Sequence, residues 1–222
     1  MVDFRIGWTG LAGLEHQAAL RDVPRETFMA QEHWAEAYRD KPMQDPDGHP
    51  IVPPSRLAWQ LQAAGVQPGE RVLELSRESG YRAAVLASLG ARVIRVEEEP
   101  AQAFFIADRM VELGLSVPVK RGPLAQGWAV DAPYDLIIIE DAPGLSPMDL
   151  QHQLAEGGRI LVVEGFELTR HSLLAGSLVE RSFLPLGNTL PTHDWAWVPD
   201  AGVPALYIEE HTPGFDPPPS GF

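Results

Sequence analysis

The sequence predicts an α/β fold built on a doubly wound, mainly parallel sheet. Short apolar runs alternate with segments of helical apolar spacing from residue 71 to residue 163. The strongest run, residues 134–140, has the continuous apolar centre expected of a strand buried on both faces. At 222 residues and 45% hydrophobic content, the chain is long enough for one domain with a full core.

The individual elements follow from apolar periodicity and from the positions of proline and glycine. The expected strands are residues 71–75, 92–97, 117–120, 134–140 and 159–163, and the helices between them are 79–88, 100–113 and 146–154. Residues 11–40 and 55–65 are expected to be helical, with Ser55 as a helix cap and Gly65 as the end, and the Pro/Gly-rich stretch 42–54 is expected to be a loop. Two last strands, 177–186 and 205–210, suggest a closing antiparallel hairpin.

These elements fit one domain over residues 1–222. We expect an N-terminal helical segment over 1–66, a sheet-containing core over 67–212 and a proline-rich tail over 213–222. The sheet should contain about seven strands.

The amino-acid composition disfavours or excludes several kinds of binding partner and of catalytic or metal-binding chemistry. The 31 acidic residues exceed the 17 basic ones, so a formal net charge of -14 disfavours nucleic acid and anionic membranes as partners. The chain has no cysteine, which excludes disulfides, thiolate nucleophiles and cysteine-ligated metals. The seven histidines show no metal-ligand spacing, so no metal site is expected. No apolar run approaches the roughly 18 residues of a membrane span, and a cytoplasmic location is expected.

Three stretches carry short motifs in a fixed order. They are Val23-Pro24-Arg25-Glu26 with residues 37–42, residues 68–74 with 79–87, and residues 133–137 with Gly157-Gly158-Arg159. Over residues 20 to about 165 the chain therefore resembles the protein-L-isoaspartate O-methyltransferase family. The resemblance implies a Rossmann-like class I methyltransferase fold, with S-adenosylmethionine (SAM) at the carboxyl ends of the central strands. It also implies an isoaspartyl carboxylate as the methyl acceptor.

The resemblance assigns five residues to the cofactor site, where they would be vestigial: Glu74, Ser76, Gly80, Glu97 and Gly122. The family's loop reads acid-x-Gly-x-Gly-x-Gly, whereas this chain keeps only the acid and the last glycine. Glu78 would add a negative charge where the cofactor passes, and a non-glycine residue at a positive-φ position of the loop would be strained. Glu97 fits a carboxylate that holds the ribose hydroxyls, or else belongs to a solvated acidic cluster with Glu98 and Glu99.

Two further positions depart from the family pattern. Pro123 lacks the acceptor that often contacts the adenine amine, and Val52 stands where the family has the catalytic hydroxyl. Ser55 lies three residues later and would be a candidate only in an active enzyme. The sequence therefore predicts no catalytic residue and no bound cofactor, although SAM would be the cofactor if the protein is active.

We therefore expect a catalytically degenerate family member that serves as an accessory subunit of a larger protein assembly, such as a respiratory complex. The alternative is an active, divergent SAM-dependent protein carboxyl methyltransferase. Trp195, Trp197 and the tail Pro213–Phe222 suggest a docking surface for the partner protein, or a tail that covers its own domain.

Overall fold

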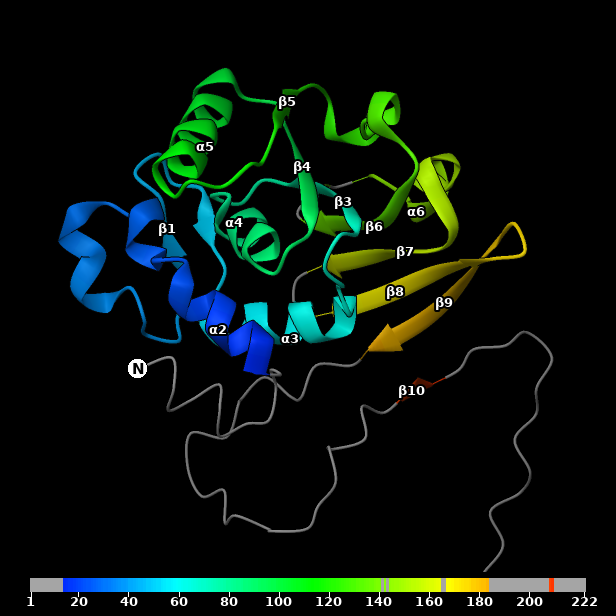
Figure 1. Cartoon of the computed structure of the whole chain (residues 1–222), viewed down its shortest axis with the longest axis horizontal. Coiled ribbons are helices and arrows are strands. Elements are labelled where there is room, and N and C mark those ends of the chain that lie inside the picture. The colour runs from blue at the N-terminus through cyan, green and yellow to red at the C-terminus, as the bar shows by residue number, and fades with distance from the viewer. Residues whose placement is uncertain (1–13, 141, 143, 165–166, 184–207, 210–222) are drawn as a thin grey trace, which may run out of the picture.

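The computed structural model describes residues 14–140, 142, 144–164, 167–183 and 208–209, and within them one large sheet dominates. Its strand order is β10-β9-β8-β7-β6-β3-β4-β5 (Figure 1). The strands are β3 (Arg71–Ser76), β4 (Arg92–Glu97), β5 (Val119–Arg121), β6 (Tyr134–Glu140), β7 (Leu154–Glu164), β8 (Glu167–Leu174), β9 (Ser177–Phe183) and β10 (Ile208–Glu209).

The central strands are parallel, as the sequence predicts. β3 pairs with both β4 and β6 in parallel, with Leu73 opposite Ile94 on one side and Ile137 on the other. β7 extends the parallel set, and β8, β9 and β10 then follow in antiparallel order. The fold class is confirmed: a Rossmann-like, mainly parallel sheet with antiparallel strands at one end.

The hairpin at the end of the chain differs from the prediction. The hairpin that follows β7 is β8–β9, and the sequence analysis missed β8 entirely. Six of the eight residues of β8 are partly buried or exposed, and five of these six are polar, so the strand lacks the apolar run by which the other strands were found. The second predicted strand, 205–210, corresponds to the two-residue β10, which pairs with β9.

Helices cover both faces of the sheet. α2 (Leu14–Asp22), α3 (Pro54–Ala64), α4 (Tyr81–Ser88) and α5 (Pro100–Glu112) pack on one face, and the short α6 (Pro147–Leu150) lies on the other (Figure 1). Short 3₁₀ turns complete the set: η1 (Arg25–Phe28), η2 (Gln31–Glu36), η3 (Leu124–Gln126), η4 (Ala129–Asp131) and η5 (Gln151–Gln153). No helix among the described residues is both long and apolar enough to span a membrane.

The segment before β3 corrects two expectations. The predicted loop 42–54 contains a small antiparallel hairpin of β1 (Met43–Gln44) and β2 (Pro50–Ile51). Ser55 is not the cap of α3, because Pro53 holds that position and Ser55 lies within the first turn, where its N–H donates to Asp40 Oδ1 at 3.1 Å. Gly65 ends α3 with φ +55°, as expected.

The sheet order places several strand ends together. Because β3, β4, β5 and β6 are parallel neighbours, their carboxyl ends meet at one edge of the sheet. Ser76, Glu97 and Glu140 are the last residues of β3, β4 and β6. In open α/β sheets, ligands bind at this edge.

Arg159 lies in the middle of β7, opposite Leu136 on β6, and joins the sheet to α3. Its guanidinium donates to the carbonyl oxygens of Ala64 and Gly65 at 2.5 and 2.9 Å, which belong to the last turn of that helix. It also forms two parallel hydrogen bonds with the Glu70 carboxylate at 2.9 and 2.8 Å. One buried arginine therefore caps a helix and also binds a carboxylate. The two parallel hydrogen bonds to that carboxylate need the planar guanidinium group, which lysine lacks.

We predict that Arg159→Lys lowers the free energy of unfolding by about 2 kcal/mol, because lysine keeps the charge and loses the paired contacts. Urea denaturation measures the change. Arg92→Lys is the matched control, since Arg92 is exposed and its guanidinium donates to a single carbonyl, that of Gly69, at 3.0 Å. Equal stability losses in the two variants would contradict the anchoring role of Arg159.

Candidate functional site

The five residues assigned to a cofactor site lie together at the carboxyl edge of the sheet. The side chains of Glu74, Ser76 and Glu97 are buried there. Gly80 begins α4, and the N–H of Gly122 donates to the Glu97 carbonyl at 3.1 Å. The next residue, Pro123, precedes η3, and its side chain offers no hydrogen-bond acceptor for an adenine.

The loop between β3 and α4 needs glycine at one position only. Gly80 has φ +95°, and an added Cβ atom there would lie 2.8 Å from Ile106 Cγ2. The residues before it, from Ser76 to Ser79, have no positive φ. The substituted positions therefore carry no such backbone strain, because the one left-handed position of this loop kept its glycine.

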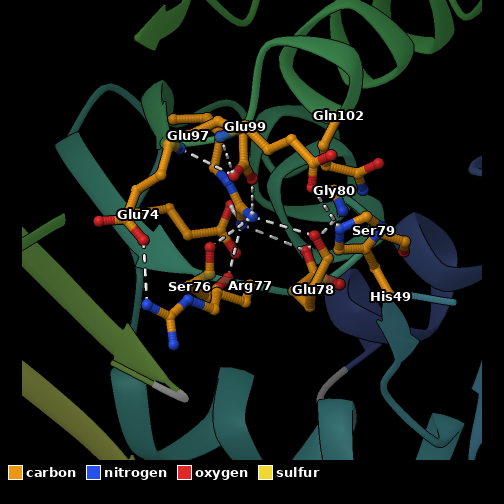
Figure 2. Close-up of polar contacts among 12 residues, drawn as sticks. His49, Glu74, Ser76, Arg77, Glu78, Ser79, Gly80, Glu97, Glu99 and Gln102 are labelled. Carbon is orange, nitrogen blue, oxygen red and sulfur yellow. Dashed lines mark hydrogen bonds and ion pairs between the residues drawn. The ribbon is translucent and has the colours of Figure 1, made fainter. Parts of the chain in front are cut away.

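A buried arginine occupies the centre of this loop. Arg95 is on β4, and its guanidinium donates to Ser76 Oγ at 2.5 Å, to the Ser76 carbonyl at 2.7 Å and to the Glu78 carbonyl at 3.0 Å. It also lies 3.3 Å from Glu97 Oε2 and 3.3 Å from Glu74 Oε2. Figure 2 shows Ser76, Glu78 and Glu97 arranged around a common centre. The loop is thus folded around a side chain of the protein itself.

Glu97 has the fixed geometry of a binding carboxylate. Its Oε1 accepts the N–H groups of Glu98 and Glu99 at 2.8 and 3.2 Å, while Oε2 faces Arg95. Glu97 is 3% exposed, whereas the side chains of Glu98 and Glu99 are 40% and 61% exposed. The acidic run is therefore divided: Glu97 belongs to the buried site, and its two neighbours face solvent.

Glu78 turns inward and does not project into open space. Its side chain is 2% exposed, and Oε1 accepts the Gly80 N–H at 2.9 Å. Burial, followed by the charge of Glu74, raises the pKa of Glu78 to about 7. The expected extra negative charge is therefore partly removed by protonation near neutral pH.

A second buried network adjoins the first through Glu74. Arg82 on α4 donates to Glu74 Oε1 at 2.7 Å and also pairs with Glu140 at the end of β6. Gln60 and Arg56 on α3 donate to Glu140 Oε1 at 3.2 and 3.1 Å. Burial lowers the pKa of Arg82, but the charges of Glu140 and Glu74 outweigh this effect and raise it. Four elements are therefore held by one set of paired charges.

The segment that should carry the catalytic hydroxyl lies against the same loop. The Pro50 carbonyl accepts the Ser79 N–H at 2.9 Å, which ties the hairpin β1–β2 to the loop. Val52 is buried two residues later, at 6% exposure, and offers no hydrogen bond. Ser55 is the first hydroxyl after it and lies in the first turn of α3.

The sequence did not predict a set of three interacting polar side chains beside this hairpin, those of Asp45, His49 and Gln102. The Asp45 carboxylate is fully buried and lies 3.3 Å from His49 Nδ1, and Gln102 Nε2 donates to it at 2.8 Å. His49 Nε2 lies 3.6 Å from Glu99 Oε2, so the ring faces the acidic end of β4 (Figure 2). The described part of the chain contains no cluster that could hold a metal ion.

Arg82, Arg95 and Glu140 were also missed. The available signal was a charged residue inside an apolar strand, as in Arg95 between Ile94 and Val96. Trp195, Trp197 and the tail Pro213–Phe222 lie outside the described residues.

Comparison with known proteins identifies the family. The sequence profile described as "Protein-L-isoaspartate(D-aspartate) O-methyltransferase (PCMT)" matches residues 13–171. This chain belongs to that family. A relative named protein-L-isoaspartate O-methyltransferase from Gloeobacter violaceus is 37% identical over 84% of this chain and 94% of its own length. Another of that name, from Methylorubrum populi, is 40% identical over 66% and 69%.

Solved structures of the family have the same fold. A structure named protein-L-isoaspartate O-methyltransferase superposes with a TM-score of 0.71 at 22% identity, over 84% of this chain and 65% of that one. A putative member from Plasmodium falciparum, in complex with S-adenosyl-L-homocysteine, has a TM-score of 0.68 at 16% identity, over 84% and 94%.

The residues present fit SAM at two anchoring points. Glu97 is an oriented carboxylate at the end of β4, and α4 begins at Gly80, where there is no room for a side chain. Between these points the guanidinium of Arg95 binds the loop carbonyls and Glu97. SAM can therefore fit between these two points only if the Arg95 guanidinium moves away from the loop carbonyls.

The pKa of Glu78 predicts a pH dependence of stability. Its folded pKa of about 7 exceeds the ordinary carboxyl value of 4.5, so the folded state binds the proton more tightly than the unfolded state. Stability is therefore full below pH 4.5 and is lost as the pH rises to about 7. Relative to Glu78→Gln, the wild type should lose about 3 kcal/mol across this range, by the free-energy equivalent of the pKa shift.

Chemical denaturation at pH 4.5 and pH 8 tests this prediction. Glu98→Gln is the control, because the Glu98 side chain is 40% exposed and should leave the pH dependence unchanged. A constant difference between wild type and Glu78→Gln at both pH values would contradict the shifted pKa.

Proposed function

We propose that this protein is a SAM-dependent carboxyl methyltransferase that acts on isoaspartyl residues in damaged polypeptides. The observation that carries the proposal is the Glu97 carboxylate, which two N–H groups hold at the end of β4, on the sheet edge where α4 begins at Gly80. Family membership and the names of the relatives support the same activity.

The roles of this chain's own residues follow from that geometry. Glu97 would accept hydrogen bonds from the ribose hydroxyls, and the N-terminal turn of α4 would face the carboxylate end of the cofactor. SAM supplies the electrophilic methyl group when it is bound. The acceptor carboxylate is already ionised at neutral pH, so the protein needs to orient it and does not need to remove a proton.

A second candidate is the catalytically degenerate, accessory role predicted from the sequence. The observation that favours it is Arg95, which neutralises Glu97 and binds the loop from within. Val52 at the expected hydroxyl position points the same way. A protein partner would then explain why the fold is kept, with the C-terminal tail as the proposed docking segment.

A methyl-transfer assay separates the two candidates. We expect isoaspartyl peptide to accept the methyl group of SAM, and the matched peptide with normal aspartate to accept none. Turnover should be slow, below about 1 per second, because the site must first release Arg95. Background-level transfer to both peptides, with an enzyme of known activity as the positive control, would favour the accessory role.

Ser55 provides a test of how the acceptor is oriented. It is the one hydroxyl between Pro50 and Arg56, a segment that the structure describes in full. Ser55→Ala should lower kcat about tenfold, the effect of about one lost hydrogen bond, while the affinity for SAM stays constant. Ser88→Ala, at the far end of α4, is the control. Unchanged kcat in Ser55→Ala would remove Ser55 from the mechanism.

A further inference from the structure

We propose that Arg95 sets the cofactor affinity of this protein, because its guanidinium is an intramolecular cation that SAM must displace. The inference rests on the proposed use of this edge as a SAM site, and it concerns a residue that sequence motifs do not assign.

Arg95 binds the same groups that the proposed cofactor site would offer to a ligand. Its donors bind two main-chain carbonyls of the loop, those of Ser76 and Glu78, and the Glu97 carboxylate. The proposed site uses this loop and carboxylate to bind a ligand. Arg95 is 0% exposed, so these bonds are made without competition from water.

The carboxylates around Arg95 should favour a positively charged ligand as the group that replaces its guanidinium. Glu74, Glu78 and Glu97 all lie within 3.6 Å of the Arg95 guanidinium. SAM carries a positive sulfonium, whereas S-adenosylhomocysteine has a neutral thioether at the same place. Without Arg95 the site should therefore gain more affinity for SAM than for S-adenosylhomocysteine.

The loop sequence agrees with this role. Ser76 contributes both its hydroxyl and its carbonyl to Arg95, and Glu78 contributes its carbonyl and a nearby carboxylate. Ser76 and Glu78 stand at the two positions where the family pattern has glycine and this chain does not. The substitutions and Arg95 thus form one interacting set, and the effects of changing them should not be additive.

The rival account is that Arg95 only balances buried charge. In that case its removal would change stability and leave ligand affinity unaffected. Measuring SAM and S-adenosylhomocysteine affinities by calorimetry, alongside thermal unfolding, separates the two accounts.

The main variant is the full chain with Arg95→Ser and Glu78→Gly together, which removes the cation and one carboxylate that it would leave unpaired. We expect it to bind SAM at least about tenfold more tightly than the wild type, with a smaller gain for S-adenosylhomocysteine. Arg92→Ser is the matched control on the same strand, and it should bind both ligands as the wild type does.

Arg95→Lys gives the same test if the double variant does not fold. Lysine keeps the buried charge but cannot bind both loop carbonyls through a planar fork. We expect SAM to bind this variant about threefold or more tightly than the wild type.

Three outcomes decide whether Arg95 sets the affinity for SAM. Equal SAM affinity in the wild type and the folded variants, or no binding to any of them, overturns the role of Arg95. Tight binding by the variants alone supports it and shows that the wild type is not an active methyltransferase. Wild-type methyl transfer with unchanged affinity in the variants supports the proposed function and overturns this inference.

Discussion

The Glu74 carboxylate, shared between two buried arginines, is the interaction on which the rest of the site depends. It lies 2.7 Å from Arg82 on α4 and 3.3 Å from Arg95 on β4. Burying charges is costly unless each is paired, so these residues fix the relative positions of β3, α4 and β4. The whole cluster contains three arginines and four carboxylates: Arg56, Arg82, Arg95, Glu74, Glu78, Glu97 and Glu140. Protonation of Glu78, favoured by its raised pKa, would balance them.

This charge balance explains how a glycine-rich loop can lose most of its glycines without strain. A family loop that leaves room for a ligand needs small residues, whereas this loop encloses Arg95 and can carry larger ones. Ser76 and Glu78 use ordinary backbone angles, and Gly80 alone requires a left-handed conformation. The departures from the family pattern are therefore one coordinated change at the loop, together with the separate change at Val52.

The sequence predicts the parallel strands well because each is a short apolar run between helices. It fails for β8, whose partly buried, polar side chains carry no such pattern. Within the site, Glu97 and Gly80 are found from local motifs. Arg95 and Arg82 are not, since they bind groups that are distant in the sequence: Arg82 pairs with Glu140, 58 residues away, and Arg95 donates to Ser76, 19 residues away. The inward turn of Glu78 was likewise unpredictable, because it depends on those same arginines.

The most direct test follows the side chain of Arg95 itself by NMR. Buried guanidinium groups give resolved Nε–Hε signals, and those of Arg95 and Arg82 can be assigned by substitution to lysine. During titration of the wild type with SAM, the Arg95 signal should shift or broaden as its contacts with Ser76 and Glu78 break, while the Arg82 signal stays in place. An Arg95 signal that remains unchanged at saturating SAM would contradict the account.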